Sequence, residues 1–451
     1  MGHADPSLDV NVMDYQWIPF TPNRDFRAEP KLFVRAEGVH YWSDKGDKIL
    51  DGSSGLFCVP LGHGRREIAD AVHQQLLELD FAGAFCRSHP KAFQLAKKVA
   101  EFTPAGMNRV FFTNSGSEAV DTAMKIALAY HHAKGEGGRS MFVSRERAYH
   151  GVNMGGVGLS GLVRNRDVFG PGVAGVVHMR STVLPENRFV RGQPQKGAEL
   201  AEDLARLIAL HGAQNIAAVF IEPIAGSTGC LPPPLGYLER VRELCTQHGI
   251  LLVFDEVING LGRTGYDFAS KAFNVTPDIL TMAKALTNGM QPMGAVAVRQ
   301  DIHDAIVNRG PQHLVEFFHG YTYTAHPASC AAGLATLEIY QRENTFEKAR
   351  ELGKYFLDRV FELQDLPCMA DIRGYGLMAA FDLKVKDGKP GLAGHEVQKR
   401  LFDAGLHVKA TGDAIIMAPA YVAERTHVDE MMSIIRAVLS KWTRVPGRAA
   451  G

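Results

Sequence analysis

Short apolar runs alternate with amphipathic segments through the middle of the chain, and this alternation constrains the fold more than any other feature. The apolar runs are too short for uncapped helices and are typical of buried strands; they lie at 110–113, 141–144, 217–221, 250–254 and 279–282. Apolar residues at helical spacing lie between them, at 117–132, 200–210 and 235–248. Strands that alternate with helices form right-handed βαβ units, so the sequence predicts an α/β fold with a mostly parallel sheet.

The chain is long enough for two domains, and its pattern changes near residue 325. A chain of 451 residues exceeds what one compact core usually holds. Beyond residue 325, long helical patterns at 331–342 and 346–363 precede a strand-like segment at 371–383, as in an α+β domain. We expect an N-terminal arm and meander that belong to a smaller domain, then a large domain, then the rest of the smaller domain, at 1–66, 67–328 and 329–451.

The segment 148–197 is rich in Gly, Arg and Pro and shows little periodicity. It is too long for an idle linker inside a compact domain, so we expect an active-site loop region. Residues 156–161 match the G-x-G-x-x-G pattern of dinucleotide-binding folds, but they neither follow a clear strand nor open a helical pattern. We therefore exclude a dinucleotide site there.

The balanced charge and the scattered cysteines limit the partners and the compartment. Lys plus Arg and Asp plus Glu number 49 each, which argues against nucleic acid or an anionic membrane as a partner. No apolar run approaches the roughly 20 residues of a membrane helix. The six cysteines form no C-x-x-C pair, which indicates free thiols in a reducing cytoplasm. Cysteines and histidines do not cluster at zinc-binding spacing, so no metal site is expected.

Polar residues follow several of the predicted strands. Glu222, Asp255 and Lys284 stand directly at or beyond strand ends. The aromatic and glycine of 149–151 (Tyr-His-Gly) follow another strand, and they fit either simple packing or a platform for a flat cofactor. Each residue alone fits a solvated strand end. Because ligands bind outside the carboxyl ends of the strands in an open α/β sheet, the set together indicates one pocket.

The segment 113–119 (TNSGSEA) lies between a strand and a helix and allows two interpretations. Ser115 and Glu118 have the spacing of a capping box. Gly116, between the hydroxyl residues Ser115 and Ser117, also permits close approach of an anion, because free N–H groups and the helix dipole favour a phosphate there. Both interpretations can hold together, and the sequence leaves them open.

Two longer motifs surround the acid and the lysine: FDEVINGLGRTG at 254–265 and PDILTMAKALTNG at 277–289. With their spacing they resemble the signature of the class III (ω-type) aminotransferases, which are fold-type I enzymes that use pyridoxal 5'-phosphate (PLP). Further similar stretches extend the resemblance over nearly the whole chain, at 16–24, 54–57, 149–151 and 316–327. Within the class, the chain most resembles the β-alanine (ω-amino acid):pyruvate aminotransferases.

The resemblance assigns roles to the residues of the pocket. Lys284 would hold PLP through a Schiff base and carry the proton of the reacting substrate carbon, while Asp255 would pair with the pyridinium nitrogen. Tyr149 and Val257 would lie on the two faces of the ring, and Thr322 would reach the phosphate from a partner subunit. The implied cofactor-binding set is Ser115, Gly116, Ser117, Tyr149, His150, Glu222, Asp255, Val257, Lys284 and Thr322.

Two positions of the implied substrate site depart from the subgroup pattern. Phe57 stands where the subgroup has Trp at the pocket mouth, and Lys409 stands where it has an Arg that grips a carboxylate. A lysine offers a point charge where an arginine offers a bidentate fork. Lys409 fits a solvated lysine at a strand end about as well. With Tyr149, these residues form the expected substrate-binding set, which puts β-alanine in doubt as the preferred donor and leaves taurine-like, polyamine-like and simple amine donors open.

The resemblance also implies an architecture, an activity and an assembly. It implies a large domain with a mostly parallel seven-stranded sheet and a smaller α+β domain. It implies ping-pong transfer of an amino group from an ω-amino acid or amine to a keto acid, with pyruvate as the expected acceptor. A homodimer with a shared active site, or a tetramer, follows from the role of Thr322. An aminomutase or racemase of the same fold is the alternative within PLP chemistry, and a non-enzymatic or nucleotide-binding α/β protein is the alternative outside it.

Overall fold

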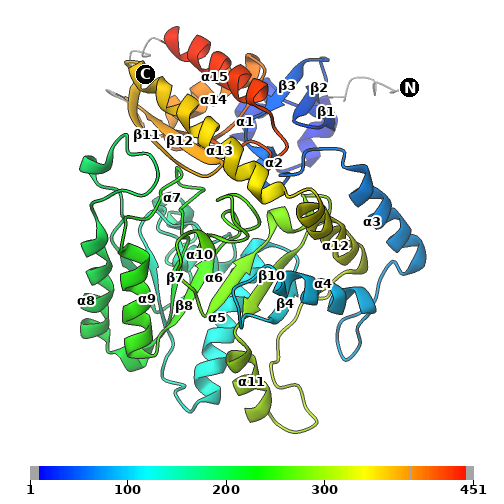
Figure 1. The fold of residues 1–451 in the computed structure, drawn as a ribbon, viewed down its shortest axis with the longest axis vertical. Helices are drawn as coiled ribbons and strands as arrows, with labels where there is room; N and C mark the ends of the chain where they lie inside the picture. Colours follow the sequence, from blue (N-terminus) through cyan, green and yellow to red (C-terminus); the bar gives the residue numbers. More distant parts are fainter. Residues whose placement is uncertain (1–9, 386–388, 443–451) are drawn as a thin grey trace.

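The computed structural model describes residues 10–385 and 389–442. Its centre is a seven-stranded sheet of order β4-β10-β9-β8-β7-β5-β6 (Figure 1). The strands are β4 (Arg109–Thr113), β5 (Met141–Arg145), β6 (Val176–Met179), β7 (Ile216–Ile221), β8 (Leu251–Asp255), β9 (Ile279–Met282) and β10 (Gly294–Val298). Strand β10 pairs antiparallel with β4 and β9, whereas the other pairings are parallel. The predicted α/β fold with a mostly parallel seven-stranded sheet is confirmed.

Helices cover both faces of this sheet because its central strands are apolar on both sides. Every residue of β7 and β8 is buried. Leu252 and Phe254 belong to the hydrophobic cluster that includes residues of α9 (Tyr237–His248). Leu251 and Val253 belong to the cluster that includes α5 (Gly116–Ala133). Alternate side chains of one strand therefore fill two different cores, as expected for a strand between helical layers.

Two smaller sheets accompany the central one, and the first of them joins the two ends of the chain. One has the order β1-β2-β3-β13, and the other has the order β11-β12-β15-β14. Their strands are β1 (Phe33–Glu37), β2 (His40–Ser43), β3 (Lys48–Asp51), β11 (Met369–Tyr375), β12 (Met378–Leu383), β13 (Leu406–His407), β14 (Lys409–Thr411) and β15 (Ala414–Met417). Strand β13 pairs parallel with β3, so the N-terminal meander lies beside C-terminal elements above the central sheet (Figure 1). The three domain ranges stay a prediction, and residues 1–9, 386–388 and 443–451 within them lie outside the described residues.

The remaining helices pack around these sheets. Those near the large sheet are α3 (Arg66–Glu78), α4 (Pro90–Ala100), α6 (Met154–Leu159), α7 (Val163–Arg166), α8 (Glu202–His211), α10 (Ala269–Ala272), α11 (Gln300–Arg309) and α12 (Pro327–Arg342). Those near the smaller sheets are α1 (Asn23–Ala28), α2 (Ser54–Phe57), α13 (Thr345–Phe361), α14 (Leu392–Asp403) and α15 (Arg425–Ser440). The 3-10 helices are η1 (Val10–Tyr15), η2 (Pro185–Asn187), η3 (Ala198–Ala201), η4 (Ala213–Asn215), η5 (Lys284–Thr287) and η6 (Glu362–Asp365).

Some local predictions were wrong or incomplete. The supposed loop region 148–197 contains α6, α7 and the sheet strand β6. The segment 371–383 forms two strands, β11 and β12, because the chain reverses at Gly376, which has a φ of 58° that favours glycine. Strand β10 and helix α11 were not predicted. The glycines at 156–161 lie in or just beyond α6, where Gly156 approaches the backbone so closely that a Cβ atom would lie 2.4 Å from the His150 carbonyl oxygen.

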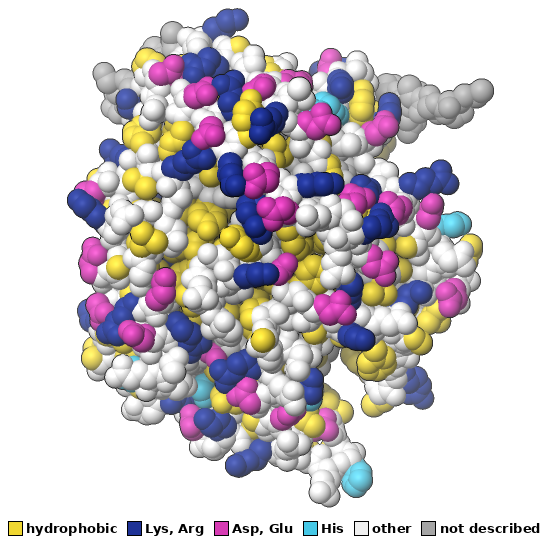
Figure 2. Space-filling model, in the orientation of Figure 1, with side chains coloured by type: hydrophobic (Ala, Val, Ile, Leu, Met, Phe, Trp, Pro, Cys, Tyr) yellow, Lys and Arg dark blue, Asp and Glu magenta, His cyan; other side chains and the backbone are white. Residues whose placement is uncertain are grey.

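Basic and acidic side chains are interspersed over the face shown in Figure 2. Their mixture reflects the equal numbers of the two charges in the sequence. Within the described part of the chain, no helix combines the length and the apolar character that crossing a membrane requires. The same residues contain no group of three or more His, Cys, Asp and Glu side chains arranged to hold a metal ion.

Candidate active site

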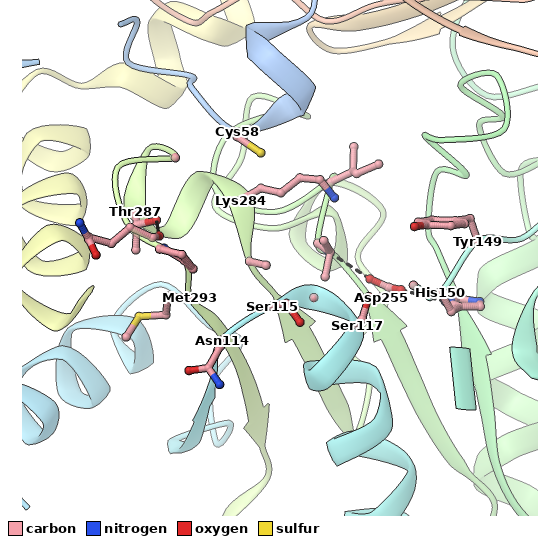
Figure 3. A pocket seen from close by; sticks show the side chains of 18 of the residues that line it. Cys58, Asn114, Ser115, Ser117, Tyr149, His150, Asp255, Lys284, Thr287 and Met293 are labelled. Carbon is pink, nitrogen blue, oxygen red and sulfur yellow. Dashed lines mark hydrogen bonds and ion pairs between the residues drawn. The ribbon is translucent and has the colours of Figure 1, made fainter. Parts of the chain in front are cut away.

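A cavity of about 340 Å³ lies at the carboxyl ends of the central strands. Its walls include residues that follow four of the parallel strands, together with the beginning of α5 and the residue Cys58 (Figure 3). Ten residues were assigned to cofactor binding from the sequence. Nine of these residues line the cavity: Ser115, Gly116, Ser117, Tyr149, His150, Glu222, Asp255, Val257 and Lys284. The topology of the sheet therefore brings together residues that are far apart in the sequence.

Asp255 ends β8 and is held in one orientation by three donors. His150 Nδ1 lies 2.8 Å from Oδ2 of Asp255. The backbone N–H of Val257 and the hydroxyl of Thr281 each donate to Oδ1 over 3.2 Å. Asp255 is 6% exposed, and that small exposed part faces the cavity. The carboxylate is thus a fixed acceptor at the cavity wall, suited to a cationic N–H group of a ligand.

Lys284 follows β9 at an abrupt turn. Its backbone has a φ of 45°, which is uncommon for a residue with a side chain, and it begins the 3-10 helix η5. Figure 3 shows its side chain extending into the cavity, between Cys58 on one side and Asp255 on the other. Strained backbone of this kind persists where the surrounding structure fixes it, and it is often found at functional sites. The amine of Lys284 therefore faces the same space as the carboxylate of Asp255.

The beginning of α5 combines the two interpretations that the sequence left open. The Ser115 hydroxyl accepts a hydrogen bond from Glu118 N over 3.1 Å, and Glu118 Oε2 accepts one from Asn114 N over 2.7 Å. Ser115 is thus the N-cap, and Glu118 reaches back to the residue before it, a variation on the predicted capping box. The N–H groups of Gly116 and Ser117 lie in the first helical turn, where a helix supplies no acceptor of its own. They remain suited to an anion in the cavity, strengthened by the helix dipole.

We call the N–H groups of Gly116 and Ser117 the anion cradle. Two glycines leave the narrow space around this cradle free of side chains. A Cβ atom on Gly116 would lie 2.9 Å from Cγ1 of Val257, and one on Gly151 would lie 2.6 Å from the hydroxyl oxygen of Ser117. Gly151 also has a φ of 95°. The Ser117 hydroxyl accepts a hydrogen bond from Val152 N over 3.1 Å, which ties the cradle to the segment that carries Tyr149. Side chains at these glycines would displace the walls of the cradle.

Glu222 and Tyr149 form another part of the cavity wall. The backbone N–H of Tyr149 donates to Oε1 of Glu222 over 2.9 Å. Burial raises the pKa of the Glu222 carboxyl to about 7, with the nearby charge of Asp255 adding to the effect and His150 opposing it. Burial, and then the charges of Asp255 and Glu222, raise the pKa of the Tyr149 hydroxyl. Glu222 can therefore hold or release a proton near neutral pH, next to the cavity.

Three residues predicted for the site lie outside the cavity wall. Phe57 is only 2% exposed, and its ring centre lies 5.6 Å from Nζ of Lys409. Lys409 donates to the carbonyl oxygen of Ser227 over 3.4 Å. Burial, and then the charge of Lys284, lower the pKa of Lys409 to about 8, while the charge of Glu222 opposes them. Thr322 is exposed. The substrate and cofactor roles of Phe57, Lys409 and Thr322 stay predictions.

Several residues in or beside the cavity wall were missed from the sequence, and Thr281 and Cys58 are two of them. Thr281 contacts Asp255 because the parallel pairing of β8 and β9 sets these two residues opposite each other. The sequence shows a threonine three positions before Lys284, but not the strand register that brings it to Asp255. Cys58 lines the cavity although its neighbour Phe57 was the residue expected there. A bend within 54–57 turns the two side chains in different directions.

The cavity fits PLP. Asp255 supplies a buried carboxylate for a ring nitrogen, Lys284 supplies a primary amine, and the first turn of α5 supplies N–H groups for a phosphate. The fit depends on the narrow space that Gly116 leaves beside Val257, because a Cβ atom would fill it. Buried Nε2 of His150 has no hydrogen-bond partner within the described residues, so the Nδ1 contact to Asp255 alone orients this ring.

Known proteins resemble this chain along almost its whole length. The family model for class III aminotransferases matches residues 24–439. An omega-aminotransferase of Caulobacter vibrioides is 48% identical over 437 residues, covering 97% of this chain and 99% of the relative. The omega-amino acid–pyruvate aminotransferase of Pseudomonas putida is 44% identical over 442 residues, covering 97% and 98%. The crystal structure of the omega transaminase from Pseudomonas jessenii in complex with PMP has a TM-score of 0.91 at 31% identity, covering 96% and 98%.

Proposed function

The chain belongs to the class III aminotransferases, a family of PLP-dependent enzymes, and on that premise we propose that it moves an amino group from an ω-amino acid or amine to pyruvate. The relatives named as omega-amino acid–pyruvate and beta-alanine–pyruvate aminotransferases support this choice of substrates. The reaction has two halves. The donor leaves as an aldehyde or ketone, and the keto acid then takes up the amino group.

One observation carries the proposal beyond family membership. Asp255 ends β8, Lys284 stands just beyond β9, and these two strands are parallel neighbours. Both residues face one cavity, whose wall also includes the beginning of α5. This places a fixed carboxylate, a primary amine and an anion cradle around a single space. A site that binds a phosphorylated pyridine aldehyde needs these three groups.

The residues that would hold the cofactor follow from their positions. Asp255 would pair with the ring nitrogen, Gly116 and Ser117 would donate backbone N–H groups to the phosphate, and Tyr149 and Val257 would border the ring. When bound, PLP supplies an aldehyde carbon that bonds to amines and a protonated ring that accepts electrons. Lys284 would bind that carbon through Nζ and, when released, would carry the proton of the reacting substrate carbon.

Neighbouring residues would keep these groups in place. His150 and Thr281 hold the Asp255 carboxylate from both of its oxygens, so its free edge stays toward the cavity. Glu222 accepts from the backbone of Tyr149 and would keep that residue against the ring. Its carboxyl titrates near neutral pH and would support the part of the ring next to it. Fixed groups of this kind need no reorganisation during the reaction.

We propose that Lys409 and Phe57 border the substrate. The Lys409 ammonium lies over the Phe57 ring, where a cation is attracted to the aromatic face. A carboxylate of pyruvate or of an ω-amino acid would add the anionic partner that this half-buried lysine lacks in the contact with Phe57. Because lysine presents a point charge, the site would tolerate carboxylates at several angles and would select less sharply than an arginine fork.

We also propose that two copies of the chain form the working enzyme. Phe318 is 94% exposed, and Leu314 and Tyr323 on the same connection are exposed as well. Apolar side chains exposed together are typical of a surface that another protein covers. Thr322 lies among them and would reach the phosphate site of the second copy.

The six cysteines, all free in the structure, support a location in the reducing cytoplasm.

A donor panel tests the proposed reaction. Purified holoenzyme is supplied with pyruvate and one donor at a time (β-alanine, taurine, putrescine or 1-phenylethylamine), and alanine is measured. We expect alanine from at least one donor, with loss of an equal amount of that donor. Alanine from none of them would contradict the substrate assignment. Isomerisation of a donor without pyruvate would instead indicate an aminomutase or racemase.

A further inference from the structure

The turn at 53–58, next to the cavity, has a strained backbone. Ser54 and Phe57 have φ values of 48° and 62°, and Gly55 between them has a φ of 68°. Residues with side chains rarely adopt this left-handed region. Such conformations persist only where surrounding groups impose them, and they occur often at functional sites. The groups that hold this turn are therefore of functional interest.

Asp51 is the main holder of the turn. Its Oδ1 accepts from Ser53 N over 3.1 Å, and its Oδ2 accepts from Gly55 N over 2.5 Å. His63 Nε2 lies 2.8 Å from the same Oδ2. Asp51 is 3% exposed, so water cannot replace these donors. Because a carboxylate only accepts hydrogen bonds, Nε2 of His63 must carry the hydrogen.

His63 is itself fixed by the N-terminal meander. Its backbone exchanges two hydrogen bonds with Gly38, at 2.7 Å and 3.0 Å. Its ring lies beside the ring of Tyr41, with centroids 4.4 Å apart. The imidazole therefore approaches Asp51 from a position that β1 and β2 determine, independently of the turn. The Asp51 carboxylate transmits that position to the backbone of Ser53 and Gly55.

The turn places one side chain in the cavity wall and another against Lys409. Phe57 packs beneath the Lys409 ammonium, and Cys58 lines the cavity that contains Lys284. A second anchor fixes the turn from another direction, because the Ser54 hydroxyl donates to the Ala418 carbonyl over 2.6 Å. The direction in which Phe57 and Cys58 point thus depends on the hydrogen bonds made at Ser53, Ser54 and Gly55.

We infer that Asp51 and His63 are positioning residues. They hold the strained 53–58 turn so that Phe57 and Cys58 shape the part of the active site that contacts the amine substrate. This inference rests on the proposed function for its meaning in catalysis. Loss of the pair would let the turn relax toward ordinary backbone conformations. Cys58, which is half-buried in the structure, would then become more accessible, and the contact surface for the amine donor would lose its shape while the cofactor residues stay in place.

Alkylation of Cys58 in the holoenzyme tests the positional part directly. Iodoacetamide labelling is followed by peptide mass mapping, with the half-buried Cys368 as the internal reference. We expect Asp51→Asn to accelerate Cys58 labelling at least 10-fold. The side-chain NH2 group of Asn would face N–H groups that now donate hydrogen bonds to the carboxylate, and those hydrogen bonds would be lost. The matched control is Asp203→Asn, which alters a buried aspartate that accepts from Arg180 N over 2.8 Å, away from the cavity.

A pair of histidine variants keeps the test decisive if Asp51→Asn does not fold. His63→Ala removes the donor to Asp51, whereas His63→Gln can place an amide N–H where Nε2 now lies. We expect fast Cys58 labelling in His63→Ala and a rate close to that of the parent in His63→Gln. Unchanged labelling in His63→Ala, or equally fast labelling in Asp203→Asn, would overturn the inference.

Steady-state kinetics tests the catalytic part. With a donor that the parent enzyme accepts, we expect Asp51→Asn or His63→Ala to raise KM for the donor at least 5-fold, with a smaller change in kcat. A fall in kcat with KM unchanged would overturn the positioning role. Failure of every donor with the parent enzyme would contradict the proposed function, and the labelling rates would still decide whether Asp51 and His63 hold the turn.

Discussion

His150 Nδ1 lies 2.8 Å from Oδ2 of Asp255; His150 stands in the loop after β5, and Asp255 ends β8. A carboxylate only accepts hydrogen bonds, so Nδ1 carries the hydrogen and the histidine is a donor in this pair. The contact fixes one oxygen of Asp255 while Thr281 and the backbone of Val257 fix the other. The free edge of the carboxylate consequently has one direction, toward the cavity.

Asp255→Asn should lower kcat by about 100-fold or more, because an amide cannot hold a proton on the ring nitrogen of the cofactor as a carboxylate does. The variant should also change the pH dependence of the absorbance of the bound cofactor. Both are measured on purified holoenzyme with one accepted donor and pyruvate. Asp203→Asn, a buried aspartate away from the cavity, is the control and should retain the parent's kcat. A kcat near that of the parent in Asp255→Asn would contradict the role of this carboxylate.

Glu222→Gln should change the dependence of stability on pH in the cofactor-free protein. The pKa of Glu222 is about 7 in the fold and 4.5 ordinarily, so the native state keeps a proton that the unfolded chain loses between these values. The stability contributed by Glu222 is therefore complete below 4.5 and is lost as the pH rises through 7, by about 3 kcal/mol. Gln cannot ionise and does not lose this contribution.

The measurement is the melting temperature of Glu222→Gln minus that of the parent at pH 5 and at pH 8. We expect this difference to increase by a few degrees toward pH 8. Gln can still accept the hydrogen bond from Tyr149 N. Glu256, whose pKa burial also raises to about 7, titrates in both proteins and cancels in the difference. A difference that stays constant or decreases would show that the carboxyl of Glu222 is not held protonated by burial.

Gly116→Ala should weaken cofactor binding by about 10-fold or more, as expected for overpacking that costs 1–3 kcal/mol in a tight space. The added Cβ atom would lie 2.9 Å from Val257 and narrow the anion cradle. The dissociation constant is measured by titrating the cofactor-free protein with PLP. Gly138→Ala is a matched control, because its Cβ atom would lie 4.0 Å from the nearest oxygen. Equal affinities of the two variants for PLP would exclude an anion cradle at this helix.

Lys409→Arg should remove a pH dependence of the KM for pyruvate. Burial lowers the pKa of Lys409 to about 8, so the ammonium loses its charge as the pH rises through that value and its attraction for a carboxylate falls. We expect the parent's KM for pyruvate to rise about 5-fold between pH 7 and pH 9.5, and the Arg variant's to change little because a guanidinium stays charged. Parallel KM profiles in the two proteins would argue that Lys409 does not contact the carboxylate.

The alternation of apolar runs and helical patterns was sufficient to predict the central sheet. Strands β7 and β8 are apolar almost along their whole length, and such runs are typical of strands that are covered on both faces. Strand β6 was hidden because the surrounding segment is rich in Gly, Arg and Pro. Strand β10 pairs antiparallel at the edge region of the sheet, which the βαβ rule does not predict.

The candidate site could be predicted where a residue stands at a strand end and could not where contact depends on register or on a turn. Asp255, Glu222 and Lys284 belong to the first kind. Thr281 belongs to the second, because only the pairing of β8 with β9 places it opposite Asp255. Phe57 was expected at the pocket mouth, and that role stays a prediction; in the structure it packs on Lys409, and the next residue, Cys58, lines the cavity.

The identity of the lysine that binds the cofactor tests the central proposal most directly. Borohydride reduction of the holoenzyme makes the bond between the cofactor and a lysine Nζ permanent, and peptide mass mapping then locates the added mass. We expect the mass on the peptide that contains Lys284 in the parent protein, and no such mass in Lys284→Ala. Cofactor mass on another lysine, such as Lys409, or no covalent mass in the parent would contradict the proposal.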